Sequence, residues 1–189
     1  TNNVITNARI GIQTGNYQTA HIGSAPYGRI ENNSIEARAV GVFYNLHNFS
    51  PWTISNNTIT GLDNATEAGS NTRPWRGMLV GSLGNNMGPT ITSGNTINGS
   101  GITLFTTGKE GVNIWNVQNN APLHITGSMI SGVETGVFLN NFEGYSSDGS
   151  SGAHALVSGS SINASNIGIR LLDSPSSTTH GNIQATLMN

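Results

Sequence analysis

The feature that most limits what this chain of 189 residues can fold into is a short phrase that recurs along it. The phrase begins and ends with an aliphatic residue and carries small polar residues, mostly asparagine and serine, between them. A second phrase, a glycine flanked by apolar residues, follows most copies. A unit of 24 to 38 residues cannot bury its apolar residues alone, so this repetition predicts units stacked on one another. Copies of the first phrase occupy residues 30–35, 54–59, 91–97, 125–130 and 157–162, and the clearest glycine phrases occupy residues 10–12, 40–42, 135–138 and 167–169.

The composition indicates strands rather than helices. Asn, Ser, Thr and Gly make up 92 of the 189 residues, and only 8% of the residues are charged. These four types compete with helical hydrogen bonds or lose entropy in a helix. In Thr53-Ile54-Ser55, and likewise in residues 90–92 and 124–126, the middle residue is expected to point inward and its neighbours outward. Because a net charge of −2 supplies little self-repulsion, we expect an ordered all-β protein.

Stacking of the repeats predicts a single-stranded parallel β-helix, a solenoid of about six coils with three short strands in each. Residues 1–189 are expected to form one domain. Asn33, Asn57 and Asn95 occupy the same place in successive copies, so we expect a ladder of side-chain amides continued by Ser128 and Ser160. Both ends of the sequence stop within a repeat. The chain is therefore expected to be a segment of a longer polypeptide, or to meet other subunits at its ends.

A known group of proteins carries the same phrases. The Ile-x-Asn-Asn-x-Ile pattern at residues 30–35 and 54–59, the glycine phrase after it and the Asn column resemble the generic parallel β-helix repeats of the pectin-lyase-like superfamily. The resemblance covers residues 2–187 and implies that the β-helix is right-handed. It also implies a secreted or cell-surface protein. Because the matched residues build the scaffold, the resemblance carries no catalytic residue.

Several classes of function are not expected from the ionisable residues. Seven Lys and Arg residues, set against nine Asp and Glu, form no basic cluster that would bind nucleic acid. No apolar run approaches the length needed for membrane insertion. The chain has no cysteine and its five histidines are isolated from one another, so neither a metal site nor a cofactor is expected.

Aromatic and ionisable residues gather in the longer segments between the phrases, which are expected to be loops on one side of the column. These segments are residues 13–28, 44–51, 63–75, 81–89, 105–122, 140–154 and 172–181. An aromatic face beside amides, Arg and carboxylates suits a sugar ring and its hydroxyl groups. The candidate ligand-binding residues are Trp75, Arg73, Arg76, Trp115, Glu143, Tyr145, His47 and Trp52.

Three functions remain open. The leading expectation is a non-catalytic extracellular or cell-surface module, such as a stalk or adhesin segment, that contacts a polysaccharide or glycan through the loop side. The first alternative is a polysaccharide lyase or glycoside hydrolase. The resemblance implies clustered Asp residues for such enzymes, and Ca²⁺ for the lyases, but the carboxylates of this chain are scattered. Its candidate residues are Asp63, Glu67, Arg73, Arg76, Lys109, Glu110, Glu143 and Asp148.

The second alternative is a structural segment like those of phage tail spikes. Open ends and trimer contacts are natural in such a segment. The sequence does not distinguish a monomer from an end-to-end or trimeric assembly.

Overall fold

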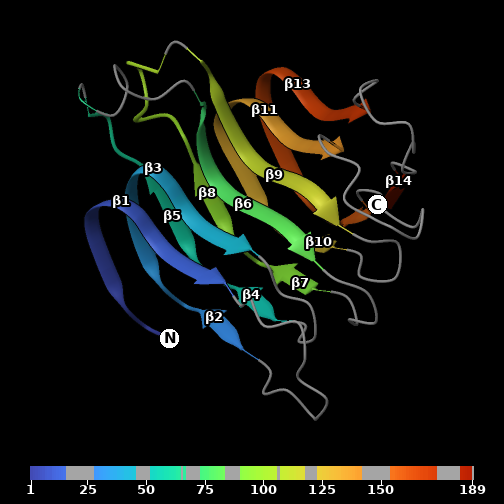
Figure 1. Ribbon diagram of the computed structural model, residues 1–189, viewed down its shortest axis with the longest axis horizontal. Coiled ribbons are helices and arrows are strands. Elements are labelled where there is room, and N and C mark those ends of the chain that lie inside the picture. Colours follow the sequence, from blue (N-terminus) through green and yellow to red (C-terminus); the bar gives the residue numbers. More distant parts are fainter. Residues whose placement is uncertain are drawn as a thin grey trace.

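The protein is described from a computed structural model, which covers residues 1–15, 28–45, 52–64, 66, 73–83, 90–105, 107–117, 123–141, 154–173 and 184–188. Every sheet is parallel, which confirms the prediction of an all-β chain with parallel strands (Figure 1). Sheet A contains β1 (Val4–Gly15), β3 (Ser34–Asn45), β5 (Thr58–Gly61), β6 (Trp75–Leu83), β8 (Thr96–Asn98), β9 (Lys109–Val117), β11 (Met129–Asn141) and β13 (Ser161–Asp173). Sheet B contains β2 (Arg29–Glu31), β4 (Thr53–Ser55), β7 (Thr90–Ser93), β10 (Leu123–Thr126), β12 (His154–Ser158) and β14 (Gln184–Met188).

The predicted fold class, a single right-handed parallel β-helix of about six coils, is wrong. In sheet A the strands β3, β5, β8, β11, β9 and β6 follow one another as hydrogen-bonded neighbours, and β6 pairs with β3 again. The six strands therefore form a closed parallel barrel rather than one face of an open solenoid, and sheet B is a second parallel sheet. β1 and β13 are attached outside the ring, to β3 and β11.

The length of two strands explains this closure. β3 pairs with β5 through residues 34–37 and with β6 through residues 40–45. β11 pairs in the same way with β8 through its first part and with β9 through its last part. In these two repeats the Ile phrase and the glycine phrase lie on one continuous strand, where the sequence predicts separate short strands. Through β3 and β11, the pairing of β5 with β8 is therefore joined to the pairing of β9 with β6, which closes the ring.

The two sequence phrases belong together because the isoleucine of one repeat packs on the glycine of the preceding repeat. A Cβ atom added to Gly136 would collide with Cγ2 of Ile162 and the backbone oxygen of Gly168. The same relation joins Gly41 to Ile59 and its equivalents in the other repeats. Close approach of a side chain to the backbone is what only glycine allows. The complete set of pairs is Gly11 with Ile35, Gly41 with Ile59, Gly77 with Ile97, Gly111 with Ile130 and Gly136 with Ile162.

The asparagine ladder is confirmed. Nδ2 of Asn33 donates to Oδ1 of Asn57 at 2.8 Å, and Nδ2 of Asn57 donates to Oδ1 of Asn95 at 2.9 Å. The backbone N–H of Asn95 then donates to Oγ of Ser128, and that of Ser128 donates to Oγ of Ser160. All three asparagines are buried, so each hydrogen bond satisfies a polar group that water does not reach.

The residue before each ladder position turns the chain through a left-handed corner. Its φ is 57° at Asn32, 55° at Asn56 and 61° at Gly94. Asn and Gly adopt this conformation at low cost, which explains why the corner residue is Asn at Asn32 and Asn56 and Gly at Gly94, Gly127 and Gly159. The sequence predicts the left-handed backbone conformation at the ladder asparagines themselves. In the structure it occurs one residue earlier, at Asn32 and Asn56.

One repeat departs from the predicted alternation. In sheet B, Thr92 lies in register with Ile54 and Ile125, while Ile91 lies beside Thr53 and His124. Thr92 is buried, and its hydroxyl donates to the backbone oxygen of His124 at 3.1 Å. The prediction that Ile91 is the inward residue is therefore wrong. The cause is the extra residue between positions 91 and 97, which shifts the strand by one.

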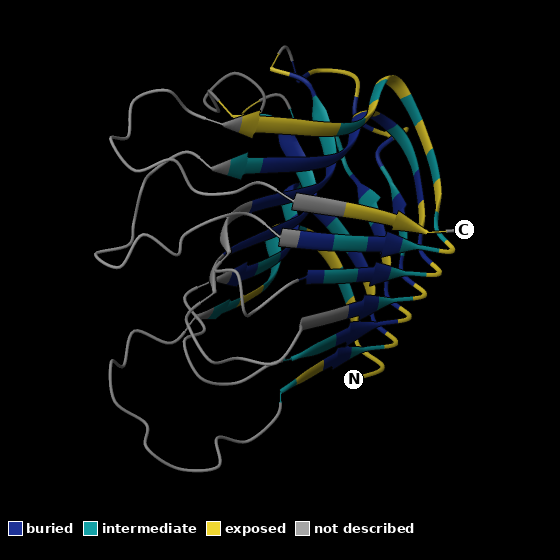
Figure 2. Ribbon diagram, turned by 90° about the vertical axis from the view of Figure 1, so that its right-hand side faces the viewer, coloured by how far each residue is buried: buried dark blue, intermediate teal, exposed yellow. Residues whose placement is uncertain are grey.

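The inward columns form one hydrophobic core that runs through all the inner repeats. Exposed apolar residues gather instead at the two ends of the stack, in β1, β13 and β14 (Figure 2). Within the part of the chain described here, no helix has the length and apolar character needed to cross a membrane.

Candidate functional site

The outer strip is the outward face of the second halves of the long sheet A strands. Phe43, Leu79 and Phe138 alternate with the core residues Val42, Met78 and Val137. Glu110 is assigned to the same face by its contact with Asn113. Leu79, Asn113, Thr135 and Phe138 of the strip are buried. Register pairing places the strip residues in two rows that cross five strands. The strip comprises Val40, Arg76, Glu110, Thr135 and Ile167 in one row and Phe43, Leu79, Asn113, Phe138 and Arg170 in the other.

A polar triad lies at the centre of the outer strip. Nε of Arg76 donates to Oε2 of Glu110 at 2.8 Å, and Nδ2 of Asn113 donates to the same oxygen at 2.8 Å. The side chains of Arg76 and Glu110 are 14% and 12% exposed. Among the described residues nothing bonds to Oε1 of Glu110 or to the terminal nitrogens of Arg76, and none of these atoms is buried without a partner. The triad therefore keeps one acceptor and several donors that no described residue uses.

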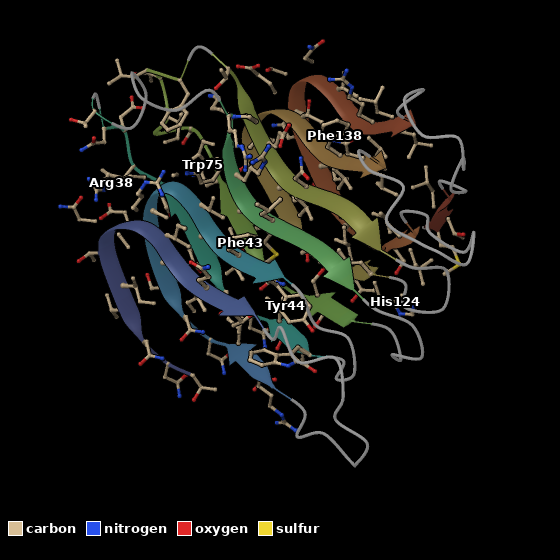
Figure 3. The ribbon with its side chains drawn as sticks, in the orientation of Figure 1. Arg38, Phe43, Tyr44, Trp75, His124 and Phe138 are labelled. Atoms are coloured by element: carbon tan, nitrogen blue, oxygen red, sulfur yellow. The ribbon has the colours of Figure 1, made fainter. Side chains whose placement is uncertain are left out.

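Aromatic residues lie on either side of the triad, on the row that contains Asn113 (Figure 3). Phe43 is half-buried, and Phe138 lies three strands away, which corresponds to about 14 Å at the usual strand spacing. The guanidinium carbon of Arg170 stands 4.9 Å from the centre of the Phe138 ring, a cation–π contact. The strip is thus several strands wide, with the half-buried Phe43 and the buried Phe138 on either side of the hydrogen-bonding groups.

Two of the tryptophans expected to bind a ligand have packing partners. Trp75 is fully buried, and its Nε1 donates to the backbone oxygen of Ala37 at 3.0 Å. Its ring fills the corner of the core beside Gly61 and Gly99. Trp52 packs against Tyr44 with ring centres 5.7 Å apart. Trp75 does not present its ring to solvent in this structure.

The other candidates fall at scattered places. Arg76 belongs to the outer strip, and Arg73 is exposed just before β6. Trp115 lies in β9 rather than in a loop, and its backbone pairs with Gly81 and Asn140 next to the strip. His47, Glu143 and Tyr145 lie outside the described residues. Arg76 pairs with Glu110, and Trp115 lies five residues further along β9, so the structure does not bring the described candidates together.

Among the residues proposed for the enzyme alternative, Asp63 holds the connection between β8 and β9 in place. Its Oδ2 accepts from the backbone N–H and the hydroxyl of Thr103, and its Oδ1 accepts from the backbone N–H of Leu104. Burial alone would raise the pKa of Asp63, but these hydrogen bonds and the charge of Lys109 together lower it. Nζ of Lys109 donates to the backbone oxygen of Ile102 at 3.1 Å. Glu67, Glu143 and Asp148 lie outside the described residues.

Sequence reasoning missed the aromatic members of the outer strip. Phe43 and Phe138 each follow directly after the inward residue of a glycine phrase, and simple alternation places such a residue on the outer face. The prediction of a loop over residues 105–122 obscured this face, because residues 109–117 form β9. Without β9 the neighbours Arg76, Glu110 and Asn113 could not be placed together.

Comparison with known protein families, characterised proteins and solved structures finds no match for this chain. The resemblance to the pectin-lyase-like superfamily therefore stays a prediction. Among the residues that the structure describes, no three His, Asp or Glu side chains gather where they could hold a metal ion.

Proposed function

We propose that this protein is a non-catalytic extracellular or cell-surface module that binds a glycan on its outer strip. The observation that carries the proposal is the Arg76–Glu110–Asn113 triad, whose remaining donors and acceptor no described residue uses, beside the half-buried ring of Phe43. The apolar face of a sugar ring packs on an aromatic side chain while its hydroxyl groups bond to polar groups beside it. Such a combination on a rigid sheet suits an extended saccharide.

The charges of the strip indicate which glycans to test first. Glu110 neutralises Arg76, so the centre of the strip carries no net charge. Arg170 is exposed at one end and contacts Phe138. We therefore expect neutral saccharides to bind across the centre, with an acidic group tolerated near Arg170.

The composition of the triad supports a binding role for the strip rather than a catalytic one. Oε2 of Glu110 accepts two hydrogen bonds, one from Nε of Arg76 and one from Nδ2 of Asn113. Glycoside hydrolysis by the common mechanism uses two carboxyl groups, one of which must act as an acid. Glu110 is the one carboxylate of the outer strip, so the strip as defined lacks that pair.

A glycan array followed by titration of the best binder tests the proposal. Phe43→Ala is expected to weaken binding about two- to tenfold, because an aromatic contact contributes roughly 0.5–1.5 kcal/mol. Leu104→Ala is the matched control, since Leu104 is an exposed apolar residue outside the strip.

Equal binding by wild type and Phe43→Ala would contradict the choice of site. Absence of binding across a panel of neutral and acidic saccharides would contradict the function. New reducing ends or unsaturated uronate products in the same mixtures would favour the lyase or hydrolase alternative instead.

A further inference from the structure

Arg38 is a half-buried arginine in β3 whose charge has no partner among the described residues. Its Nε is buried and makes no hydrogen bond, whereas its terminal nitrogens are not buried. No described carboxylate lies within ion-pair distance of its side chain. Arginines that leave the solvent are normally paired, because an uncompensated charge is costly to bury. An orphaned donor of this kind inside the protein indicates a place where an anion would be stabilised.

Arg38 lies on the same outward face of sheet A as Arg76. Burial alternates along β3, since Ala37 and Ala39 are buried while Arg38 and Val40 are half-buried. Val40 pairs in register with Arg76, and the residues on both sides of Arg76 are buried. Arg38 is therefore the diagonal neighbour of Arg76, with Cα atoms about 8 Å apart at the usual strand dimensions. Two side chains as long as arginine can reach one ligand across that distance.

The backbone around the two arginines is held firmly. Nε1 of Trp75 donates to the backbone oxygen of Ala37 at 3.0 Å, which fixes the start of β6 against this part of β3. The backbone N–H of Leu62 donates to the same oxygen. Figure 3 shows Arg38 at the bend of β3. Little ordering of the backbone would thus be needed when a ligand binds there.

The donors that remain belong to more than one arginine. Nε of Arg76 is used by Glu110, which fixes the guanidinium and leaves its terminal nitrogens without a described partner. Arg73 is exposed three residues before Arg76 and adds a positive charge. We call Arg38, Arg73 and Arg76 the arginine junction. It holds three of the seven Lys and Arg residues of the chain, a grouping that appears only when β3 and β6 pair.

The charge and shape of the site indicate which anion it suits. Glu110 and Glu36 carry negative charges near the arginine junction, and Glu36 lies two residues before Arg38. Their repulsion disfavours a phosphate monoester, which carries close to two charges at neutral pH, relative to a sulfate ester with one. A planar carboxylate is matched by a single guanidinium fork. A tetrahedral sulfate ester has three free oxygens and can accept from two guanidinium groups together.

We propose that the arginine junction binds a sulfate ester group, so that the saccharide on the outer strip is a sulfated one. The inference rests on the proposed glycan-binding function, because Arg76 belongs both to the outer strip and to the arginine junction. Terminal nitrogens of Arg38 and Arg76 donate to the sulfate oxygens, and no covalent bond changes. The uncharged part of the saccharide lies over the centre of the strip.

Four variants separate this role from a structural one. Arg38→Gln removes the charge, and Arg38→Lys keeps the charge but removes the fork. Glu36→Gln removes a repulsive charge without touching the proposed donors. Arg29→Gln is the matched control, because Arg29 is an exposed arginine of sheet B that lies 3.9 Å from Glu31. Circular dichroism of each variant confirms that it is folded.

Calorimetric titration at low salt with a neutral galactose tetrasaccharide and its mono-sulfated form tests the proposal. Wild type and Arg29→Gln are expected to bind the sulfated form about tenfold more tightly, since two charge-assisted hydrogen bonds are added. Arg38→Gln is expected to lose this preference, Arg38→Lys to retain part of it, and Glu36→Gln to increase it. Equal binding of both forms by wild type would overturn the inference but not the proposed function. A preference that survives in Arg38→Gln, or tighter binding of the phosphorylated or uronate form, would also overturn the inference.

A second measurement does not depend on glycan binding. The NMR signal of the Arg38 Nε–H is expected to shift when sodium sulfate is added to wild type, and the Arg29 signal is expected to stay in place. If neither tetrasaccharide binds, the proposed function fails, and this titration still decides the role of the arginine junction. An unchanged Arg38 signal, or equal shifts at Arg38 and Arg29, would overturn it.

Discussion

Five glycines of this chain are packing requirements, because each lies under an isoleucine side chain of the next repeat. Their backbone conformation is not the reason, since their φ values are not in the left-handed region. None of these positions has room for a methyl group. The corresponding glycine of the next repeat also places its backbone oxygen there, as Gly41 does at Gly11, so these contacts form a continuous column from Gly11 to Gly168.

Gly136→Ala and Gly168→Ala form a matched pair that measures this crowding. At Gly136 the added methyl would meet Ile162 and the backbone of Gly168, and overpacking of this kind costs about 1–3 kcal/mol. At Gly168 the methyl meets nothing, so the free energy of unfolding should change by less than about 0.5 kcal/mol. Urea unfolding at low protein concentration measures both. Equal destabilisation by the two substitutions would contradict the packing explanation.

Asp63 gives the fold a dependence on pH. Its folded pKa is lowered, because the hydrogen bonds from Thr103 and Leu104 and the Lys109 charge outweigh the effect of burial. A lowered folded pKa adds stability at pH values above the unfolded pKa, near 4, and this contribution is lost as the pH falls through the folded pKa. The difference in urea midpoint between wild type and Asp63→Asn should therefore be constant from pH 7 to about pH 5 and shrink below pH 4. A difference that grows on acidification would contradict this.

At the scale of the element, the ladder determines how strictly the repeats stay in register. Each ladder asparagine uses its side-chain oxygen as an acceptor for two N–H groups of the preceding repeat, as Asn57 does for Asn33. Its Nδ2 donates both to the next asparagine and to a backbone oxygen, as that of Asn57 does to Asn95 and Ile30. A slip of one residue would break all of these bonds together.

Asn57→Ala should be the most damaging substitution in the ladder, by about 2–4 kcal/mol, because it leaves buried donors of Asn33 and the oxygen of Ile30 without partners. Asn57→Ser should lose less, since Ser128 and Ser160 occupy equivalent positions. Asn56→Gly is the neighbouring control and should change the unfolding free energy little, because glycine suits the left-handed corner. Chemical denaturation ranks the three. A larger effect at Asn56 than at Asn57 would refute the account.

At the scale of the whole molecule, the closed ring of sheet A differs from the strands attached outside it. Strands within the ring have partners on both sides, which removes their edges. Among the described strands, β1 pairs with β3 and β13 pairs with β11. Stability should therefore be highest in the ring.

The local and periodic part of the structure follows from the amino-acid sequence alone. Alternation and composition predict strands, and the recurring phrases predict that Ile35, Ile59 and Ile97 share a column and that the asparagines form a ladder. These features depend on residues close together in one repeat and on the same residue type returning in the next. The sequence therefore contains them directly.

The closure of sheet A and the membership of the outer strip depend on contacts between separate repeats. Whether β3 continues past Ala37 depends on finding a partner for each half, and those partners, β5 and β6, come from the next repeat. β9 likewise forms in a segment without a clear strand pattern because β6 and β11 lie on either side of it. Pairing between separate repeats stabilises these strands, and no single segment of sequence carries that information.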